Sequence, residues 1–234
     1  MTSHPFEAQD KASASNARLR PRDAASLILI DRAGSRPRVL VGRRGSKHAF
    51  MPDLYVFPGG RRDRQDRNLP FLRDLQPAVL TRLAGGASDP RLADRCRALA
   101  LAALRELDEE TGLVIGRIDE GGNRHGRFSA DLGTLRYVAR AITPPGNIRR
   151  FDTRFFLTFC DEAEVDPSAI RDSAELHDLQ WLDMHDVSGL NMPAITRTIL
   201  EDVKLQMKDD PSLPFGSDGP FYFSRRGRFF HDTI

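Results

Sequence analysis

The stretch LAALRELDEETGLVIG, residues 101–116, combines a helical pattern with four acidic side chains in five consecutive positions. From about Asp94 to Thr111 the apolar residues recur at the spacing of one helix face, and Gly112 stands where a helix would end. Acidic side chains are least favourable at this end, where each costs about 0.3–1 kcal/mol against the helix dipole. The sequence therefore predicts a helix that carries unfavourable charge near its C-terminus.

Three of the acidic side chains share one face of this helix. Glu106, Glu109 and Glu110 are three and four residues apart, and Arg105 precedes Glu109 by four, where it could form a helix salt bridge. One interpretation is an ordinary solvated acidic face. The other is a site for a hard divalent cation such as Mg²⁺, whose charge would reverse the repulsion between the carboxylates. The helix alone leaves both interpretations open.

The segment YVFPGG, residues 55–60, lies upstream and predicts a short strand that runs into a tight turn. Gly59 and Gly60 have no Cβ, so their backbone can approach a ligand closely. Taken alone, such a turn is most simply structural. Together with the acidic helix it makes a loop and helix pair suited to metal-bound phosphates, which favours the metal-site interpretation.

The segment RELDEETGL, residues 105–113, resembles the second half of the Nudix box, and every specified position fits. The first half of that box asks for Gly, five residues, Glu, and seven more residues before the Arg. Counting from Gly60, the position of the Glu is occupied by Asp66, and 38 residues separate it from Arg105. The box is therefore split by an insertion.

A second resemblance concerns the split itself. The segment FMPDLYVFPGGRRDRQD, residues 50–66, resembles a long-insert Nudix branch that includes a peroxisomal coenzyme A diphosphatase. The segment RRFDTRFFL, residues 149–157, is similar to another part of that branch, and the likeness spans about residues 25–186. Other Nudix coenzyme A diphosphatases carry a His six residues before the Phe of FPGG, where this chain has Met51.

The resemblance implies a Nudix-type α/β/α sandwich with a mixed β-sheet and a helical insertion within the box. It implies an enzyme that hydrolyses the pyrophosphate bond of a nucleoside diphosphate linked to another moiety, such as coenzyme A or acyl-coenzyme A, with Mg²⁺ or Mn²⁺. ADP-ribose, NADH and dinucleoside polyphosphates are alternative substrates. A nucleotide-binding Nudix module without catalysis is a further alternative.

The resemblance also assigns roles to individual residues. Glu106, Glu109, Glu110 and a carbonyl of Gly60 would hold the metal, and Glu106, Glu109 and Arg105 would act in catalysis. Glu175 precedes the last expected strand, where many Nudix enzymes place a further carboxylate; its alternative is a surface position. Three arginines could bind substrate phosphates through bidentate hydrogen bonds, although any one of them could be an ordinary surface residue. They are Arg149, Arg150 and Arg154.

The remaining pattern divides the chain into three parts. Residues 1–23 are expected to form a flexible tail, residues 24–210 the Nudix domain with an insertion at 67–93, and residues 211–234 a C-terminal extension without a clear period. Strands are expected at 25–32, 38–44, 54–57, 134–143, 153–160 and 176–184, and a second helix from Pro193 to about Met207.

Composition excludes several classes of protein. The 234 residues are 40% apolar, which is enough for the core of one domain, but no run of about 18 apolar residues predicts a membrane span. Cys96 and Cys160 stand alone, which argues against a disulfide framework and a zinc site and favours a reducing cytoplasm.

The net charge of the chain indicates which kinds of binding partner to expect. The net charge of +2 selects neither nucleic acid nor a membrane surface, so the expected partner is a small molecule derived from a nucleoside diphosphate. RNA binding through FYFSRRGRFF, residues 221–230, is the weaker alternative, because that segment is short. The resemblance adds a homodimer as a further expectation.

Overall fold

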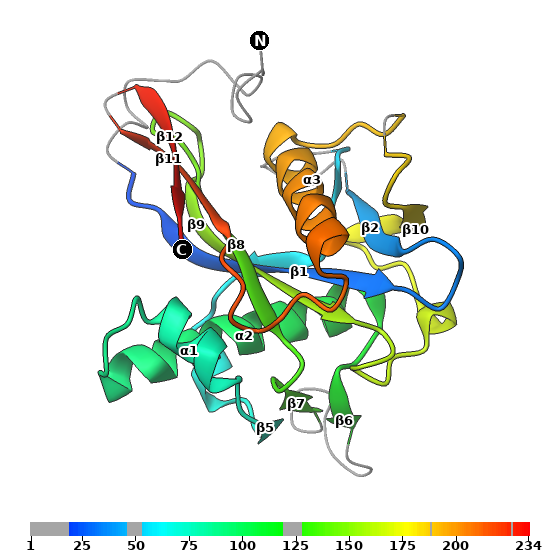
Figure 1. Cartoon of the computed structure of the whole chain (residues 1–234), viewed down its shortest axis with the longest axis horizontal. Helices are drawn as coiled ribbons and strands as arrows, with labels where there is room; N and C mark the ends of the chain where they lie inside the picture. Colours follow the sequence, from blue (N-terminus) through cyan, green and yellow to red (C-terminus); the bar gives the residue numbers. More distant parts are fainter. Residues whose placement is uncertain (1–18, 46–52, 119–127, 188, 226) are drawn as a thin grey trace.

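The computed structural model describes residues 19–45, 53–118, 128–187, 189–225 and 227–234. In these ranges the centre of the molecule is a nine-stranded mixed sheet (Figure 1). Its main path runs in the order β10 (Leu176–Asp183), β2 (Arg38–Arg44), β1 (Arg22–Asp31), β9 (Phe151–Phe159), β8 (Arg136–Ile142), β11 (Pro220–Arg225) and β12 (Arg228–Thr233). Two short strands complete it: β3 (Tyr55–Val56) pairs with β2, and β4 (Gly59–Arg61) pairs with β1.

A smaller sheet and the helical segments surround this main sheet. The smaller sheet has the order β5 (Phe71–Arg73), β7 (Phe128–Asp131) and β6 (Gly116–Ile118). The helical segments are η2 (Asp66–Asn68), α1 (Pro77–Leu83), α2 (Pro90–Thr111), η4 (Pro167–Ala169) and α3 (Ala194–Asp209).

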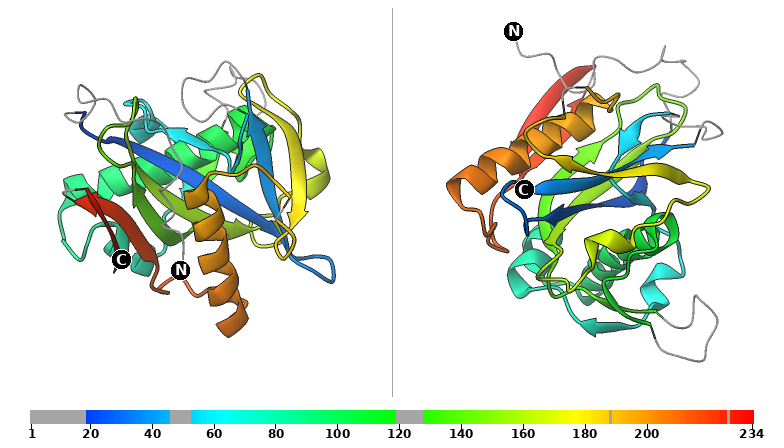
Figure 2. Two further views of the ribbon diagram at one scale, coloured as in Figure 1. Left: turned by 90° about the horizontal axis from the view of Figure 1, so that it is seen from above. Right: turned by 90° about the vertical axis from the view of Figure 1, so that its right-hand side faces the viewer.

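Strand β1 lies inside the main sheet, parallel to β9 and antiparallel to β2 and β4. Its residues from Ala24 to Asp31 are all buried, because both faces of the sheet are covered. Leu27 and Leu29 pack in the core that contains α2, whereas Ile28 and Ile30 pack in the core that contains α3. Figure 2 shows these helices on opposite faces of the sheet. The predicted α/β/α sandwich with a mixed sheet is confirmed.

The predicted elements are largely present. The six expected strands correspond to β1, β2, β3, β8, β9 and β10, and the two expected helices to α2 and α3. Helix α2 ends as predicted, with Gly112 at a φ of 73°, but begins at Pro90 rather than near Asp94. The Asp89 side chain accepts a hydrogen bond from the Arg91 backbone N–H and caps the helix there.

The insertion at residues 67–93 packs against the domain. It contains α1, and Leu75 and Val79 are buried in the core beneath α2. It also contains β5, a strand that the Pro-rich sequence did not predict, which pairs in parallel with β7. A folded segment thus joins the two parts of the chain that resemble the Nudix box.

The residues after 210, which we separated from the domain on sequence, contribute to its main sheet. Strand β11 pairs in parallel with β8, and β12 folds back antiparallel on β11. Tyr222 of β11 is buried and donates a hydrogen bond of 2.7 Å from its hydroxyl to Asp202 of α3. This hairpin is therefore continuous with the sheet and tied to the helix that covers it.

Residues 1–18 of the expected N-terminal tail, and the position of Met51, lie outside the described residues. The first strand begins at Arg22, so the end of that expected tail is already part of the sheet. Within the described ranges, none of the helices combines the length and apolar character needed to cross a membrane.

Candidate active site

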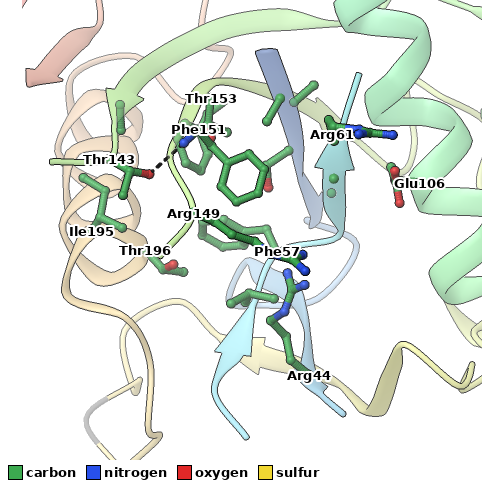
Figure 3. A pocket seen from close by; sticks show the side chains of 18 of the residues that line it. Arg44, Phe57, Arg61, Glu106, Thr143, Arg149, Phe151, Thr153, Ile195 and Thr196 are labelled. Atoms are coloured by element: carbon green, nitrogen blue, oxygen red, sulfur yellow. Dashed lines mark hydrogen bonds between the residues drawn. The ribbon is translucent and has the colours of Figure 1, made fainter. Parts of the chain in front are cut away.

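A cavity of about 560 Å³ opens beside β4 and the C-terminal half of α2 (Figure 3). Its lining comes from segments far apart in the chain: β1, the end of β2, β4, α2, the β8–β9 connection, and the segment before β10. Among the residues predicted from the sequence, those that line it are Gly60, Glu106, Glu110, Arg149 and Glu175.

The two glycines of FPGG form strand β4 and not only a turn. Gly60 pairs with Ala25 of β1, and a Cβ added to Gly60 would lie 2.3 Å from Oε1 of Glu106. The backbone N–H of Gly59 donates a hydrogen bond of 2.8 Å to Oε2 of Glu110. The missing side chain of Gly60 therefore leaves room for the Glu106 carboxylate, and the backbone N–H of Gly59 binds that of Glu110, so both carboxylates lie against β4.

The burial of these two carboxylates changes their acidity. Burial raises the pKa of Glu106 to about 7; the neighbouring Arg105 opposes this rise, and the charges of Glu109 and Glu175 add to it. Burial raises the pKa of Glu110 to about 8; the charge of Glu106 adds to this, and the Gly59 hydrogen bond opposes it. Burial and the closeness of the carboxylates to one another therefore disfavour their ionised forms, which a bound cation would favour.

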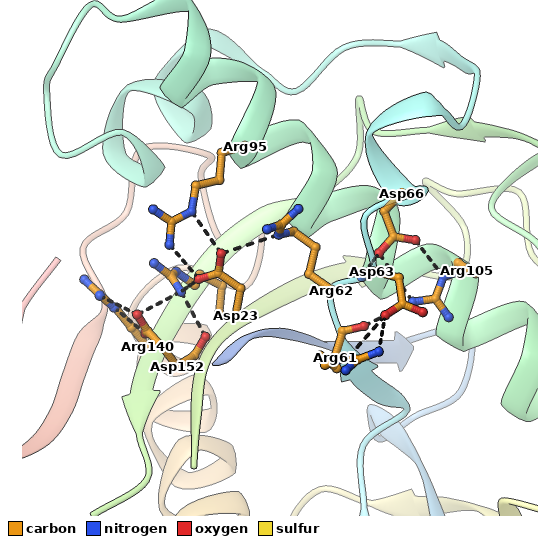
Figure 4. Close-up of polar contacts among 10 residues, drawn as sticks. Asp23, Arg61, Arg62, Asp63, Asp66, Arg95, Arg105, Arg140 and Asp152 are labelled. Carbon is orange, nitrogen blue, oxygen red and sulfur yellow. Dashed lines mark hydrogen bonds and ion pairs between the residues drawn. The ribbon is translucent and has the colours of Figure 1, made fainter. Parts of the chain in front are cut away.

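Arg105 binds several carboxylates on and beside the acidic helix face. Its Nε donates to Asp66 at 2.7 Å, the contact that Figure 4 shows. Its Nη1 donates to Glu106 at 2.9 Å and to Glu109 at 2.8 Å. Its Nη2 also donates to the carbonyl oxygen of Arg61 at 3.2 Å. Asp66 is 1% exposed, so the Asp that stands at the Glu position of the box binds Arg105 across the whole insertion.

The donor set fits a hard divalent cation, because it consists of carboxylate oxygens gathered in a partly buried place. In the described part of the chain, no three His, Cys, Asp or Glu side chains are gathered closely enough to enclose an ion as they stand. Glu109 is turned toward Arg105 and does not line the cavity. Coordination by all three helix carboxylates would thus require Glu109 to exchange its ion pair for the metal.

Glu175 and the three predicted arginines are placed differently. Glu175 is exposed at the cavity, near enough for its charge to raise the pKa of Glu106 and Glu110. Arg149 lines the same cavity, but Arg150 and Arg154 do not. Arg150 donates to backbone carbonyl oxygens, and Arg154 is ion-paired within a cluster beside β1. The structure therefore brings one of the three arginines to the carboxylates.

Sequence reasoning missed Arg44, which lines the cavity from the end of β2. Its charge lowers the pKa of Glu110, and in Figure 3 its side chain and that of Arg149 point toward one another. Phe57, Phe151 and Ile195 supply apolar walls. An arginine at a strand end in a chain rich in arginine carries no distinguishing signal, and only the fold brings it to the site.

Comparisons with known proteins point to the Nudix hydrolases that the sequence resembles. No family model matches the chain. The protein named "Putative nudix hydrolase 7" of Caenorhabditis elegans is 27% identical, with coverage of 69% of this chain and 51% of that protein. The chain thus spans about half the length of this curated relative.

Two solved structures resemble the fold. The NUDIX hydrolase from Alicyclobacillus acidocaldarius has 28% sequence identity and a TM-score of 0.58, covering 79% of this chain and 91% of that one. The NUDIX domain of Shewanella oneidensis NrtR, solved with ADP ribose, has 15% identity and a TM-score of 0.50 over 82% of this chain and 91% of that one, and shows the fold alone.

The sandwich, with its carboxylate helix against a glycine strand, defines a protein of Nudix fold with carboxylate and guanidinium groups in one cavity. The similarities above and the fit of residues 105–113 to the box support a relationship to the Nudix hydrolase superfamily.

Proposed function

We propose that this protein is a metal-dependent hydrolase that cleaves the pyrophosphate bond of a nucleoside diphosphate linked to another moiety. The observation that carries the proposal is the convergence of Glu106, Glu110 and Glu175 on one cavity that Arg44 and Arg149 also line. A volume of about 560 Å³ is within the usual range for sites that bind small molecules. Carboxylates on one side and guanidinium groups on the other suit a metal-bound diphosphate.

Different side chains have different roles in the proposed reaction. Glu106, Glu109 and Glu110 would hold Mg²⁺ or Mn²⁺, which supplies charge neutralisation and a more acidic water when bound. Glu175, exposed at the cavity, can accept a proton from the attacking water. Arg149, which forms no ion pair among the described residues, can bind phosphate oxygens, and Arg105 positions Glu106 and Glu109.

Coenzyme A or acyl-coenzyme A is our first choice of substrate, because the sequence resembles the long-insert branch described above. ADP-ribose is supported as an alternative by the NrtR domain, which shares the fold and was solved with that ligand. NADH and dinucleoside polyphosphates are further alternatives, as is a non-catalytic nucleotide-binding module. The buried acidic set favours catalysis, since a module that only binds has no need of it.

The test is a substrate screen with product identification by mass spectrometry. Wild-type protein with Mg²⁺ or Mn²⁺ should hydrolyse a phosphoric anhydride bond in at least one of coenzyme A, ADP-ribose, NADH and dinucleoside polyphosphates, releasing two products that each end in a phosphate group. The double variant Glu109→Gln, Glu110→Gln should lose about 100-fold or more in turnover, because the metal site is removed. Glu201→Gln, on the exposed side of α3, is the matched control and should retain activity.

Equal, near-zero turnover of the wild type and the double variant on every substrate would exclude the enzyme. Tight, metal-independent binding without products would instead favour the non-catalytic module.

We further propose a cytoplasmic protein, consistent with the buried free thiols of Cys96 and Cys160, and a homodimer. Light scattering after size-exclusion chromatography tests the homodimer, and a monomer would reject it. Imaging of a tagged chain tests the location, and a signal outside the cytoplasm would reject it.

A further inference from the structure

A second hollow, which we call the arginine groove, adjoins the active-site cavity. It has a volume of about 640 Å³ and is lined by four arginines, two aspartates and a glutamine: Arg22, Arg61, Arg62, Arg64, Asp23, Asp63 and Gln65. Arg61 lines both hollows, and on β1 Asp23 lines the groove while the next residue, Ala24, lines the cavity. The two hollows are therefore neighbours that share Arg61 of β4.

Both aspartates of the groove are already neutralised by arginines (Figure 4). Asp23 forms ion pairs with Arg62 at 3.4 Å, Arg95 at 2.7 Å and Arg154 at 3.2 Å. Burial opposes the ionisation of Asp23, but hydrogen bonding to Arg95 and the charges around it lower its pKa below the ordinary value. Asp63 is paired with Arg61 at 2.6 Å.

Positive charge therefore remains in the groove. Arg22 and Arg64 are both exposed, and neither forms an ion pair with any described residue. Guanidinium groups bind phosphate oxygens through paired hydrogen bonds, so a cluster with unneutralised arginines is suited to a phosphate dianion. A carboxylate ligand of the substrate would use this charge less fully, because it offers one negative charge and a single plane of oxygens.

The position of the groove relates it to the active site. Gly60 lies against the Glu106 carboxylate, and the next residue, Arg61, opens into the groove. In a nucleotide, the ribose joins the 5′ diphosphate to the 2′ and 3′ oxygens. A phosphate on either oxygen is therefore one sugar ring away from the diphosphate, which matches two adjoining hollows that share Arg61.

We propose that the arginine groove binds a phosphate monoester on the ribose of the substrate, outside the pyrophosphate that is cleaved. The proposal rests on the proposed function and narrows it to nucleoside diphosphate derivatives that carry an additional 2′ or 3′ phosphate. Coenzyme A and NADPH belong to this class, whereas ADP-ribose, NADH and 3′-dephospho-coenzyme A do not.

Two pairs of compounds that differ by one phosphate test the proposal: coenzyme A with 3′-dephospho-coenzyme A, and NADPH with NADH. The phosphorylated member of at least one pair should have a kcat/KM about tenfold or more above its partner, since hydrogen bonds to a charged phosphate are stronger than those between neutral groups. The pair that shows the preference tells whether the groove takes the 3′ or the 2′ phosphate.

A double variant, Arg22→Gln with Arg64→Gln, assigns the preference to the groove. It should abolish the preference through a rise in KM for the phosphorylated compound, while kcat/KM for the compound without the phosphate changes by less than about twofold. Arg67→Gln is the matched control, because Arg67 is exposed in the same segment but does not line the groove. It should keep the wild-type preference.

The outcomes separate this proposal from the proposed function. Equal kcat/KM within both pairs, or a preference that survives in the double variant, overturns the groove while hydrolysis stands. If no compound is cleaved, hydrolysis fails, and calorimetry decides on the groove. Adenosine 3′,5′-bisphosphate or adenosine 2′,5′-bisphosphate should then bind more tightly than 5′-AMP to the wild type but not to the double variant, and equal affinities overturn the proposal.

Discussion

Gly60 is the residue at which the absence of a side chain bears most directly on the site. A Cβ at this position would meet the carboxylate of Glu106, with Oε1 at 2.3 Å and Cδ at 2.5 Å. The atoms it would meet are the end of a side chain and not backbone, so the carboxylate could turn away while the fold stays intact. Gly59 differs, since its Cβ would lie 2.5 Å from the carbonyl oxygen of Ala25.

Gly60→Ala is expected to lower kcat/KM about 10- to 100-fold, because a displaced Glu106 can no longer serve the metal site. The melting temperature should change little. Gly34→Ala is the control, since its Cβ would meet only the Arg36 carbonyl oxygen at 3.8 Å. Steady-state kinetics and differential scanning calorimetry check the two readouts, and full activity of Gly60→Ala would contradict the proposed role of Glu106.

The ion pair between Arg105 and Asp66 is a second contact between individual residues, and it bears on the stability of the fold. Burial opposes the charge of Arg105, but the Asp66 hydrogen bond and the charges of Glu106, Asp66 and Glu109 raise its pKa. The side chains of Arg105 and Asp66 are 16% and 1% exposed. Removing Arg105 would leave a buried carboxylate without its partner.

Arg105→Met should therefore lower the free energy of unfolding by about 3 kcal/mol or more, as expected when one partner of a buried ion pair is lost. Arg36→Met removes an exposed pair with Asp183 and should cost no more than about 1 kcal/mol. Urea denaturation of both variants measures the difference. Equal, small losses would mean that the Arg105 pair does not stabilise the fold.

Helix α2 combines a stabilising end with a charged face. Its residues from Ala98 to Leu104 are all buried, so packing and not local propensity holds it in place. The unfavourable charge at its C-terminal turns is offset by Arg105 and by the Gly59 N–H, which donates to Glu110. The helix is capped at its C-terminal end by Gly112, whose backbone has a left-handed φ of 73°.

Gly112→Ala should lower the free energy of unfolding by about 1–2 kcal/mol, because an alanine in the left-handed region is strained. Gly112→Asn should lose less, since asparagine tolerates this conformation. Chemical denaturation monitored by circular dichroism compares the two variants. The same loss in both would point to a packing effect against Arg171, the side chain nearest to this position, instead of backbone strain.

The stability of the whole molecule should depend on pH through Glu106 and Glu110. Their folded-state pKa values, about 7 and about 8, lie above the ordinary 4.5. Without divalent metal, the folded protein binds more protons than the unfolded chain between about pH 4.5 and about pH 8. The free energy of unfolding therefore falls as pH rises through this range. A bound cation requires the ionised carboxylates and should reverse this trend.

Calorimetry in EDTA should therefore give a lower melting temperature at about pH 8 than at about pH 5.5, and added Mg²⁺ should raise it more at the higher pH. The double variant Glu106→Gln, Glu110→Gln should lose both effects, whereas Glu201→Gln should keep them. An Mg²⁺ effect that is absent, or equal at both pH values, would argue against metal binding by these glutamates.

Sequence patterns predicted the elements whose signals are local. The helix face of Glu106, Glu109 and Glu110 follows from residue spacing, and the six predicted strands are short apolar runs between turn residues. The hairpin of β11 and β12 has no such signal. Its alternating rings contact one another, as in the stacked pair Phe223 and Phe230, and its place at the sheet edge depends on pairing with β8.

The sequence alone specifies the acidic helix, its glycine end and the superfamily resemblance, because those properties depend on neighbours within one or two turns. Tertiary structure decides which carboxylates are buried, which arginine reaches them and where the arginine groove lies. Asp66 meets Arg105 across 39 positions, and Gly59 meets Glu110 across 51. Contacts of that separation depend on how the sheet pairs and how the insertion packs, and burial against those distant segments sets the charge and acidity of the site.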